Sequence, residues 1–362
     1  MKKKILVISP FEWDKNLYPH LYEFIEGLSD TIEIDYYYFS ERGYWIEKIS
    51  RNLKKNLFSF KGYLPIIELY KEIQKLFKVR KKYKNHQIIA IDNFIFCLSC
   101  FIFQPNQIYF WSHDFISFDN PVRKNPFQKI IIFFTKYYIG KVKCLIIQTK
   151  DRENIFYNSI KYLKKRPDVF YLPICLNMIH NNQKIREAEN NVLNFIQIGG
   201  INQYRSNSIS ILLNFNFDFG KLNFHGYVHE SIKWLIDKRK LNVVISENIL
   251  SNLDLSNKII NEVDVGLISY VNQDANFKYI THSSGQFSEF MRCYKPVIII
   301  GDTTLTSFVN ENNLGIGIKN FKDLRDAQKL VKKKYYFFVK NIIEFNEKYS
   351  LQLYVDEFLK VI

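Results

Sequence analysis

The sequence lacks the features that identify secreted and membrane-spanning proteins. Its five cysteines are an odd number, which argues against a disulfide framework and for a reducing compartment. The longest apolar stretch, residues 88–103, is broken by Asp92 and Asn93 and is shorter than the roughly 20 residues that span a bilayer. The apolar segment after the N-terminal lysines is too short for a signal peptide. We therefore expect a cytoplasmic protein, with peripheral attachment to the inner face of a membrane left open.

The motifs of several common enzyme classes are also absent. The chain has no H-E-x-x-H zinc motif, no P-loop, no G-x-S-x-G, no kinase signature and no G-x-G-x-x-G dinucleotide fingerprint. Cys97 and Cys100 form a C-x-x-C pair, but they lie in an apolar run without a second pair or a nearby histidine. We expect these two cysteines to be buried packing residues, and we predict neither a metal site nor a cofactor.

Positive charge is in excess and is unevenly distributed along the chain. The net charge is +15, and residues 1–180 hold 29 Lys and Arg against 17 Asp and Glu. Between Arg51 and Lys84, eleven basic residues face two acidic ones. Such a patch predicts an anionic partner, namely a membrane surface, a lipid diphosphate or a nucleic acid, and the alternative is a solvated basic face. No motif that reads DNA or RNA accompanies the patch, so a nucleic-acid partner is not expected.

Apolar strands alternate with helical stretches along both halves of the chain. Strands are expected near residues 5–9, 32–39, 88–91, 108–111 and 144–148, and again near residues 192–200, 222–225, 243–245, 265–270, 297–300 and 315–318. Alternation of this kind predicts parallel sheets covered by helices on both faces. A polar, Asn-rich stretch over residues 177–191 is the expected linker. We predict a first domain over residues 1–180, a second over residues 181–345 and a C-terminal helix over residues 346–362.

The stretch from Asn257 to Asp302 carries the strongest functional signal. Its pattern predicts a buried strand, a polar loop and a helix that begins with the sequence S-S-G-Q. Free backbone N–H groups and the helix dipole favour a bound phosphate at such a start. The residues expected to bind a diphosphate there are Ser283, Ser284, Gly285 and Gln286.

Glu289 lies one helical turn beyond Gly285, on the same face of the predicted helix. A carboxylate at this position can accept hydrogen bonds from a ribose diol while the helix start holds a diphosphate. The alternative is a plain βαβ unit, in which Ser283 caps the helix and Glu289 is solvated.

The order D-V-G-L-I-S-Y, S-S-G-Q-F-S-E-F, K-P-V-I-I resembles the nucleotide-sugar-binding half of GT-B glycosyltransferases, especially family 4. The resemblance implies an α/β fold with two Rossmann-like doubly wound domains that face each other across a cleft. It further implies a nucleotide-sugar as co-substrate and no metal. Thr281 stands where the family has a first glutamate, which leaves the donor sugar and the stereochemical outcome open.

Further residues for the donor follow from the same resemblance. Gly199 and Gly200 end the first strand of the second half, where glycine lets a ligand approach the backbone closely. Arg205 resembles the basic residue that follows such a turn in the family, and it can clamp a diphosphate. Lys278 lies in the loop before Ser283 and can reach donor phosphates. A tight turn with a surface arginine is the alternative.

In the first half, Trp111-Ser112-His113-Asp114 follows a predicted strand. The carboxyl end of a parallel strand is where ligand-binding groups belong. We expect His113 to act as a general base or to bind the transferring sugar, with Asp114 orienting it. The alternative is a turn capped by Asp114 beside an incidental histidine.

The resemblance therefore implies a glycosyltransferase of cell-surface polysaccharide synthesis. It would move a sugar from a nucleotide-sugar to a glycan or lipid-diphosphate-linked acceptor. The rivals are a nucleotide-sugar epimerase, for which acid and base carboxylates are not evident, and a catalytically silent GT-B subunit that supports a partner transferase. Thr281 in place of glutamate favours the silent subunit among these rivals.

Overall fold

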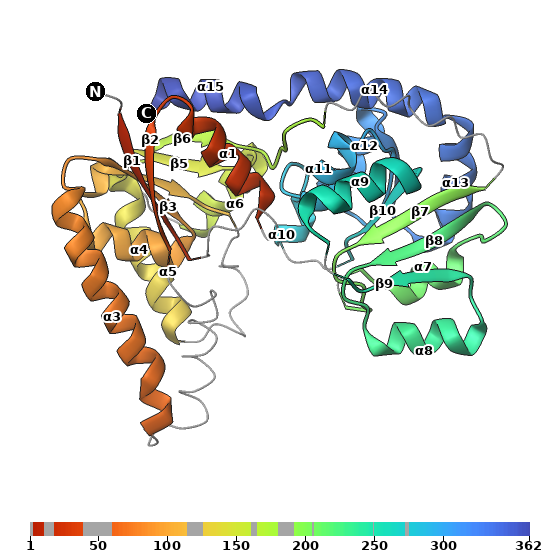
Figure 1. Ribbon diagram of the computed structural model, residues 1–362, viewed down its shortest axis with the longest axis horizontal. Coiled ribbons are helices and arrows are strands. Elements are labelled where there is room, and N and C mark those ends of the chain that lie inside the picture. Colours follow the sequence, from red (N-terminus) through yellow and green to blue (C-terminus); the bar gives the residue numbers. More distant parts are fainter. Residues whose placement is uncertain are drawn as a thin grey trace. The chain divides into compact units, whose positions relative to one another are not determined.

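A computed structural model of the chain describes residues 3–10, 18–38, 60–113, 126–160, 165–179, 192–204, 206–248, 250–271 and 275–362. These residues form two compact units (Figure 1). Unit 1 comprises Met1–Pro173 with Val355–Ile362, and unit 2 comprises Ile174–Tyr354.

Unit 1 is built on a six-stranded parallel sheet with the strand order β2-β1-β3-β4-β5-β6. Its strands are β1 (Lys4–Ser9), β2 (Glu33–Tyr38), β3 (Gln87–Ile91), β4 (Ile108–Trp111), β5 (Cys144–Ile147) and β6 (Asp168–Tyr171). Its helices are α1 (Pro19–Ser29), α3 (Phe60–Lys82), α4 (Asn93–Ile102), α5 (Pro126–Tyr138) and α6 (Lys150–Ser159), with short 3-10 turns at Pro105–Gln107 and Ile139–Lys141. The order reverses between β1 and β3, and ligands of open α/β sheets bind at the carboxyl ends of the strands beside such a switch point.

Unit 2 repeats this architecture with the strand order β12-β11-β10-β7-β8-β9. Its strands are β7 (Leu193–Ile198), β8 (Gly220–His225), β9 (Val243–Ser246), β10 (Val265–Ser269), β11 (Val297–Ile300) and β12 (Gly315–Ile318). Its helices are α7 (Ser208–Asn214), α8 (Glu230–Arg239), α9 (Asn252–Glu262), α10 (Ala275–Lys278), α11 (Gly285–Arg292), α12 (Thr304–Glu311), α13 (Leu324–Lys333) and α14 (Tyr335–Lys348), with a 3-10 turn at Phe321–Asp323. Here the order reverses between β7 and β10.

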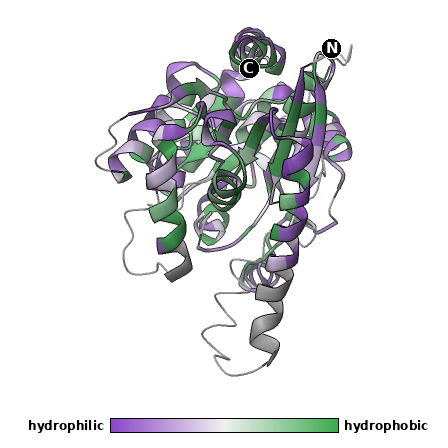
Figure 2. Ribbon diagram, turned by 90° about the vertical axis from the view of Figure 1, so that its left-hand side faces the viewer, coloured by the Kyte–Doolittle hydropathy of each residue, from purple (hydrophilic) through white to green (hydrophobic). Residues whose placement is uncertain are grey.

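The apolar runs of the sequence form the central strands because helices cover both faces of each sheet. Residues 5–8 of β1 are at most 1% exposed, and residues 297–300 of β11 are fully buried. Figure 2 shows the hydrophobic strands of unit 1 enclosed by helices that carry hydrophilic residues on their surfaces. The strands predicted from apolar runs are therefore confirmed, whereas β6 was not predicted, because this edge strand of four residues is only partly buried.

Buried cysteines and the last helix complete the packing of unit 1. Cys97 and Cys100 are buried on α4, and burial raises the pKa of the Cys97 thiol to about 12, so both are packing residues as predicted. The last turns of α15 (Leu351–Val361) belong to unit 1, where Phe358 packs against Phe24, Tyr109 and Phe170. Within the described residues, no helix combines the length and the apolar character needed to cross a bilayer.

Candidate active site

Two glycine turns meet at the carboxyl edge of the unit 2 sheet. Gly199 follows β7 and Gly226 follows β8, and both have positive φ angles, +91° and +123°. A Cβ atom on Gly226 would come within 2.3 Å of the Gly199 carbonyl oxygen, so only glycine fits. Gly199 and Gly200 are exposed, which leaves their backbone open to a ligand beside the switch point between β7 and β10.

Helix α11 begins at this same edge of the sheet, after β10. Ser284 is its N-cap: the hydroxyl accepts a hydrogen bond from the Phe287 N–H at 3.1 Å and shares another with the Tyr270 hydroxyl at 2.8 Å. Burial raises the pKa of Tyr270 to about 12, so this phenol stays neutral. Gly285 is exposed, and a Cβ atom added to it would meet no atom within 4 Å. The space next to the first residue of the helix is therefore not filled by other protein atoms.

Gln286 ties the helix start to the sheet. Its side-chain amide donates to the carbonyl oxygen of Ile198, the last residue of β7, at 2.6 Å. The same amide nitrogen lies 2.9 Å from the position that a Cβ atom on Gly199 would occupy. Gln286 thus joins the two places where the backbone is open, the turn after β7 and the first turn of α11.

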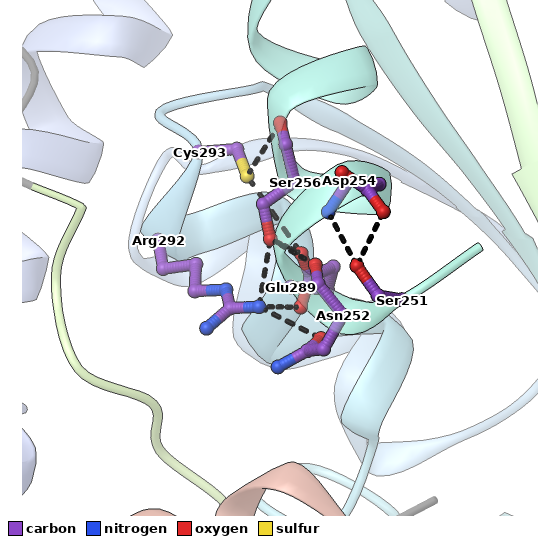
Figure 3. Close-up of polar contacts among 7 residues, drawn as sticks. All are labelled: Ser251, Asn252, Asp254, Ser256, Glu289, Arg292 and Cys293. Carbon is purple, nitrogen blue, oxygen red and sulfur yellow. Dashed lines mark hydrogen bonds and ion pairs between the residues drawn. The ribbon is translucent and has the colours of Figure 1, made fainter. Parts of the chain in front are cut away.

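Glu289 is an internal ion-pair residue in this structure (Figure 3). It is 4% exposed, its Oε2 lies 2.7 Å from Arg292 Nη2, and its Oε1 accepts a hydrogen bond from the Ser256 hydroxyl at 2.6 Å. Arg292 also donates to Ser256 Oγ at 2.7 Å and to Asn252 Oδ1 at 2.9 Å. The network ties α11 to the first turns of α9. The solvated Glu289 of the alternative interpretation is therefore wrong, as is Ser283 as the cap.

The other described residues predicted for the donor lie at or near this edge. Ser283 occupies the turn before α11 and donates through its hydroxyl to the Ile280 carbonyl at 3.3 Å. Lys278 ends α10, is exposed and places its ammonium 5.7 Å from the ring centre of Tyr279. Gly200 has ordinary room for a side chain. Arg205 lies outside the described residues.

A second group of polar side chains gathers at the carboxyl edge of the unit 1 sheet. His113 follows β4, and its Nε2 lies 2.6 Å from Nε2 of His20, the second residue of α1. The side-chain amide of Gln148, just after β5, donates to the backbone carbonyls of Ser112 and His113 at 3.1 and 3.2 Å. Asp114, the predicted partner of His113, lies outside the described residues.

His20 is a residue that the sequence reasoning missed. Burial, and secondly the charge of His113, hold the pKa of His20 well below its usual value. A histidine at the start of the helix that follows β1 was visible in the sequence. Its approach to a residue 93 positions away depends on the order of strands in the sheet.

Comparison with known proteins agrees with this architecture. Residues 235–362 match the family model described as "Glucosyltransferase 3-like, C-terminal domain". Sucrose-phosphate synthase from Thermosynechococcus elongatus superposes with a TM-score of 0.67 at 12% identity, over 99% of this chain and 98% of that chain. The chain has the GT-B fold. The predicted fold class and family resemblance are thereby confirmed.

Two further structures resemble this chain over nearly its whole length. Anabaena HepE, solved in complex with UDP-glucose, has a TM-score of 0.65 at 11% identity and covers 99% of this chain and 100% of its own. WaaG, a glycosyltransferase involved in lipopolysaccharide biosynthesis, has a TM-score of 0.64 at 11% identity and covers 99% of both chains. No curated protein sequence matches this chain.

Proposed function

We propose that the protein transfers a sugar from a UDP-sugar to a glycan or lipid-diphosphate-linked acceptor in the synthesis of a cell-surface polysaccharide. The observation that carries the proposal is the carboxyl edge of unit 2, where the open helix start at Gly285 is tied by Gln286 to the glycine turn after β7. UDP is proposed as the nucleotide because HepE, which shares the fold, was solved with UDP-glucose and with UDP.

In this proposal the start of α11 binds the diphosphate of the donor. Backbone N–H groups at a helix start point outward, and the helix dipole adds positive potential there. Ser284 caps the helix through the Phe287 N–H, so the N–H groups of Gly285 and Gln286 are left to meet the phosphate oxygens. Lys278 adds a mobile positive charge. The family resemblance is the reason for proposing that Arg205 also binds the diphosphate. Stabilising the departing UDP is the main catalytic contribution of these residues.

For Glu289 we propose a structural role, which is to hold α11 in place. Both of its carboxylate oxygens already have partners, and its side chain is buried. A buried ion pair with several hydrogen bonds fixes helices relative to one another, because breaking it would expose an uncompensated charge to the protein interior. We therefore propose that Glu289 and Arg292 hold α11 against α9, and that a direct contact between Glu289 and the ribose is secondary.

Unit 1 is proposed to supply His113 and the acceptor site. His113 acts as a hydrogen-bonding or acid–base group toward the transferring sugar. The described part of α3 is proposed to bind an anionic acceptor or membrane surface. Its exposed side chains include two aromatic residues, Tyr70 and Phe77, and many basic ones. The exposed basic residues of α3 and the turn after it are Lys71, Lys75, Lys78, Arg80, Lys81, Lys82 and Lys84. The first part of the predicted patch, residues 51–59, lies outside the described residues.

Vesicle sedimentation tests this part of the proposal. Wild-type protein should sediment with phosphatidylglycerol vesicles at low salt and be released at high salt. A variant with Lys78, Lys81 and Lys82 changed to Glu should sediment less. Equal sedimentation of both proteins would reject this surface.

The experiment that tests the proposed function is a UDP-release assay with a panel of UDP-sugars. The purified protein should release UDP from one or a few of them, and His113→Gln should remove most of that activity. Activity should persist in EDTA if, as we propose, no metal takes part in transfer. Binding of UDP without release from any UDP-sugar, with all lipid-linked and glycan acceptors tried, would favour a catalytically silent subunit.

A further inference from the structure

The closest polar contact described for His113 is with another histidine. His20 Nε2 and His113 Nε2 are 2.6 Å apart, their ring centroids are separated by 4.8 Å, and the rings are inclined by 50°. His20 is the second residue of α1, directly after the proline that begins this helix. The ring of Tyr18 adds a T-shaped contact with the ring of His113, with 6.5 Å between the ring centroids.

A hydrogen bond between two Nε2 atoms fixes how many protons the pair can carry. One Nε2 must donate and the other must accept, so one proton lies between them. When both rings are neutral, one histidine carries its proton on Nε2 and the other on Nδ1. A third proton on the pair gives one imidazolium that still donates to a neutral ring. A fourth would place two N–H groups against each other and break the contact.

The residue that His20 contacts is also held through its backbone. Gln148 donates to the carbonyl oxygens of both Ser112 and His113, and it is itself 3% exposed. The backbone of His113 is thus anchored to the end of β5 and its ring to the start of α1. Two anchors on different elements are what a catalytic group needs if its ring is to keep one orientation.

We propose that His20 is a positioning residue that fixes the ring orientation of His113 and couples the tautomer of His113 to its own. The inference rests on the role of His113 given under the proposed function. His20 itself need not touch the sugar. Its environment agrees with this role, because burial holds the pKa of His20 well below its usual value and keeps the ring neutral at neutral pH. A neutral partner can either donate to His113 or accept from it, whereas a charged one can only donate.

The test compares two replacements of His20. His20→Gln keeps a group that can donate or accept near the position of Nε2, and His20→Phe keeps the ring shape without either ability. We expect His20→Phe to lower kcat for UDP release by about 10- to 100-fold, with KM for the UDP-sugar changed less than about threefold. His20→Gln should recover a large part of kcat. The matched control is His86→Phe, which changes a unit 1 histidine that contacts Tyr83 and lies outside the site.

A spectroscopic measurement makes the inference independent of turnover. In 15N-labelled wild-type protein with both rings neutral, the fraction of His113 protonated on Nε2 should equal the fraction of His20 protonated on Nδ1. His20→Phe should move the tautomer balance of His113 toward that of a free neutral imidazole. Unchanged His113 shifts together with an unchanged kcat in His20→Phe would overturn the inference. If the wild-type protein turns over no nucleotide-sugar, the proposed function fails, and the nitrogen shifts still decide whether the tautomers of His20 and His113 are coupled.

Discussion

Replacing Arg292 with Met should destabilise unit 2 strongly, because the replacement leaves Glu289 charged and buried. Arg292 and Glu289 are 5% and 4% exposed, and their ion pair has a length of 2.7 Å (Figure 3). In Arg292→Met the carboxylate would keep the hydrogen bond from Ser256 but lose its counter-charge. Removing one partner of a buried pair costs about 3–5 kcal/mol. For a domain of this size, that loss lowers Tm by about 6–20 °C.

The double variant Glu289→Met/Arg292→Met distinguishes the cost of an unpaired buried charge from the cost of changed side-chain packing. Replacing a whole buried ion pair with apolar residues of similar volume is often close to neutral, so the double variant should regain most of the stability. Scanning calorimetry of the wild type, both single variants and the double variant gives the coupling between the two side chains. A loss below about 1 kcal/mol in Arg292→Met, or a double variant as unstable as the sum of the singles, would refute the reasoning.

The same double variant tests whether Glu289 binds the ribose of the nucleotide directly. If Glu289 only supports α11, a stable double variant should bind UDP within about threefold of wild type. A hydrogen bond from a ribose hydroxyl to a charged carboxylate is worth about 1.5–3 kcal/mol, so a direct ribose ligand would cost about 10- to 100-fold in Kd. Calorimetric titration of UDP into the variant that keeps its fold measures the difference.

Two further predictions concern two glycines of unit 2 and a partly buried histidine. Gly285→Ala should leave Tm unchanged or raise it, because the added Cβ meets no atom within 4 Å. The same variant should weaken UDP binding about tenfold, because its methyl group occupies the space of the diphosphate. Gly226→Ala should lower Tm, because φ is +123° at this position. Burial lowers the pKa of His282 from 6.5 to about 4, so the unfolded chain binds more protons than the folded one between these pH values. The free energy of unfolding should therefore fall by about 3 kcal/mol as pH drops from 6.5 to 4, and urea titrations of His282→Phe should lack this part of the decline.

The elements of the fold could be predicted from local sequence patterns. Buried parallel strands appear as continuous apolar runs, and the start of α11 was visible because a serine precedes glycine at the end of a polar loop. The cap was placed one residue too early, at Ser283 in the alternative interpretation, since two adjacent serines offer the same chemistry. The short, partly exposed β6 gave no comparable pattern.

The contacts of the candidate site depend on which strands become neighbours, and local patterns do not contain that information. Gln286 reaches the carbonyl of a residue 88 positions earlier, and His20 meets a residue 93 positions later. The spacing of Glu289 and Arg292 allowed an ion pair on one helix face, but only the packing of α9 over that face buries it. Sequence therefore predicted the strands and helix starts better than it predicted the contacts that side chains make at the carboxyl edges of the sheets.

Isothermal titration of the purified protein with UDP, GDP, dTDP, CMP and ADP tests the central claim most directly. The account predicts that UDP binds with one site per chain and that Gly285→Ala weakens this binding while preserving Tm. Binding of another nucleotide in place of UDP would contradict the assignment of the donor. Absence of binding for all five at millimolar concentration would contradict a nucleotide-sugar site at the start of α11.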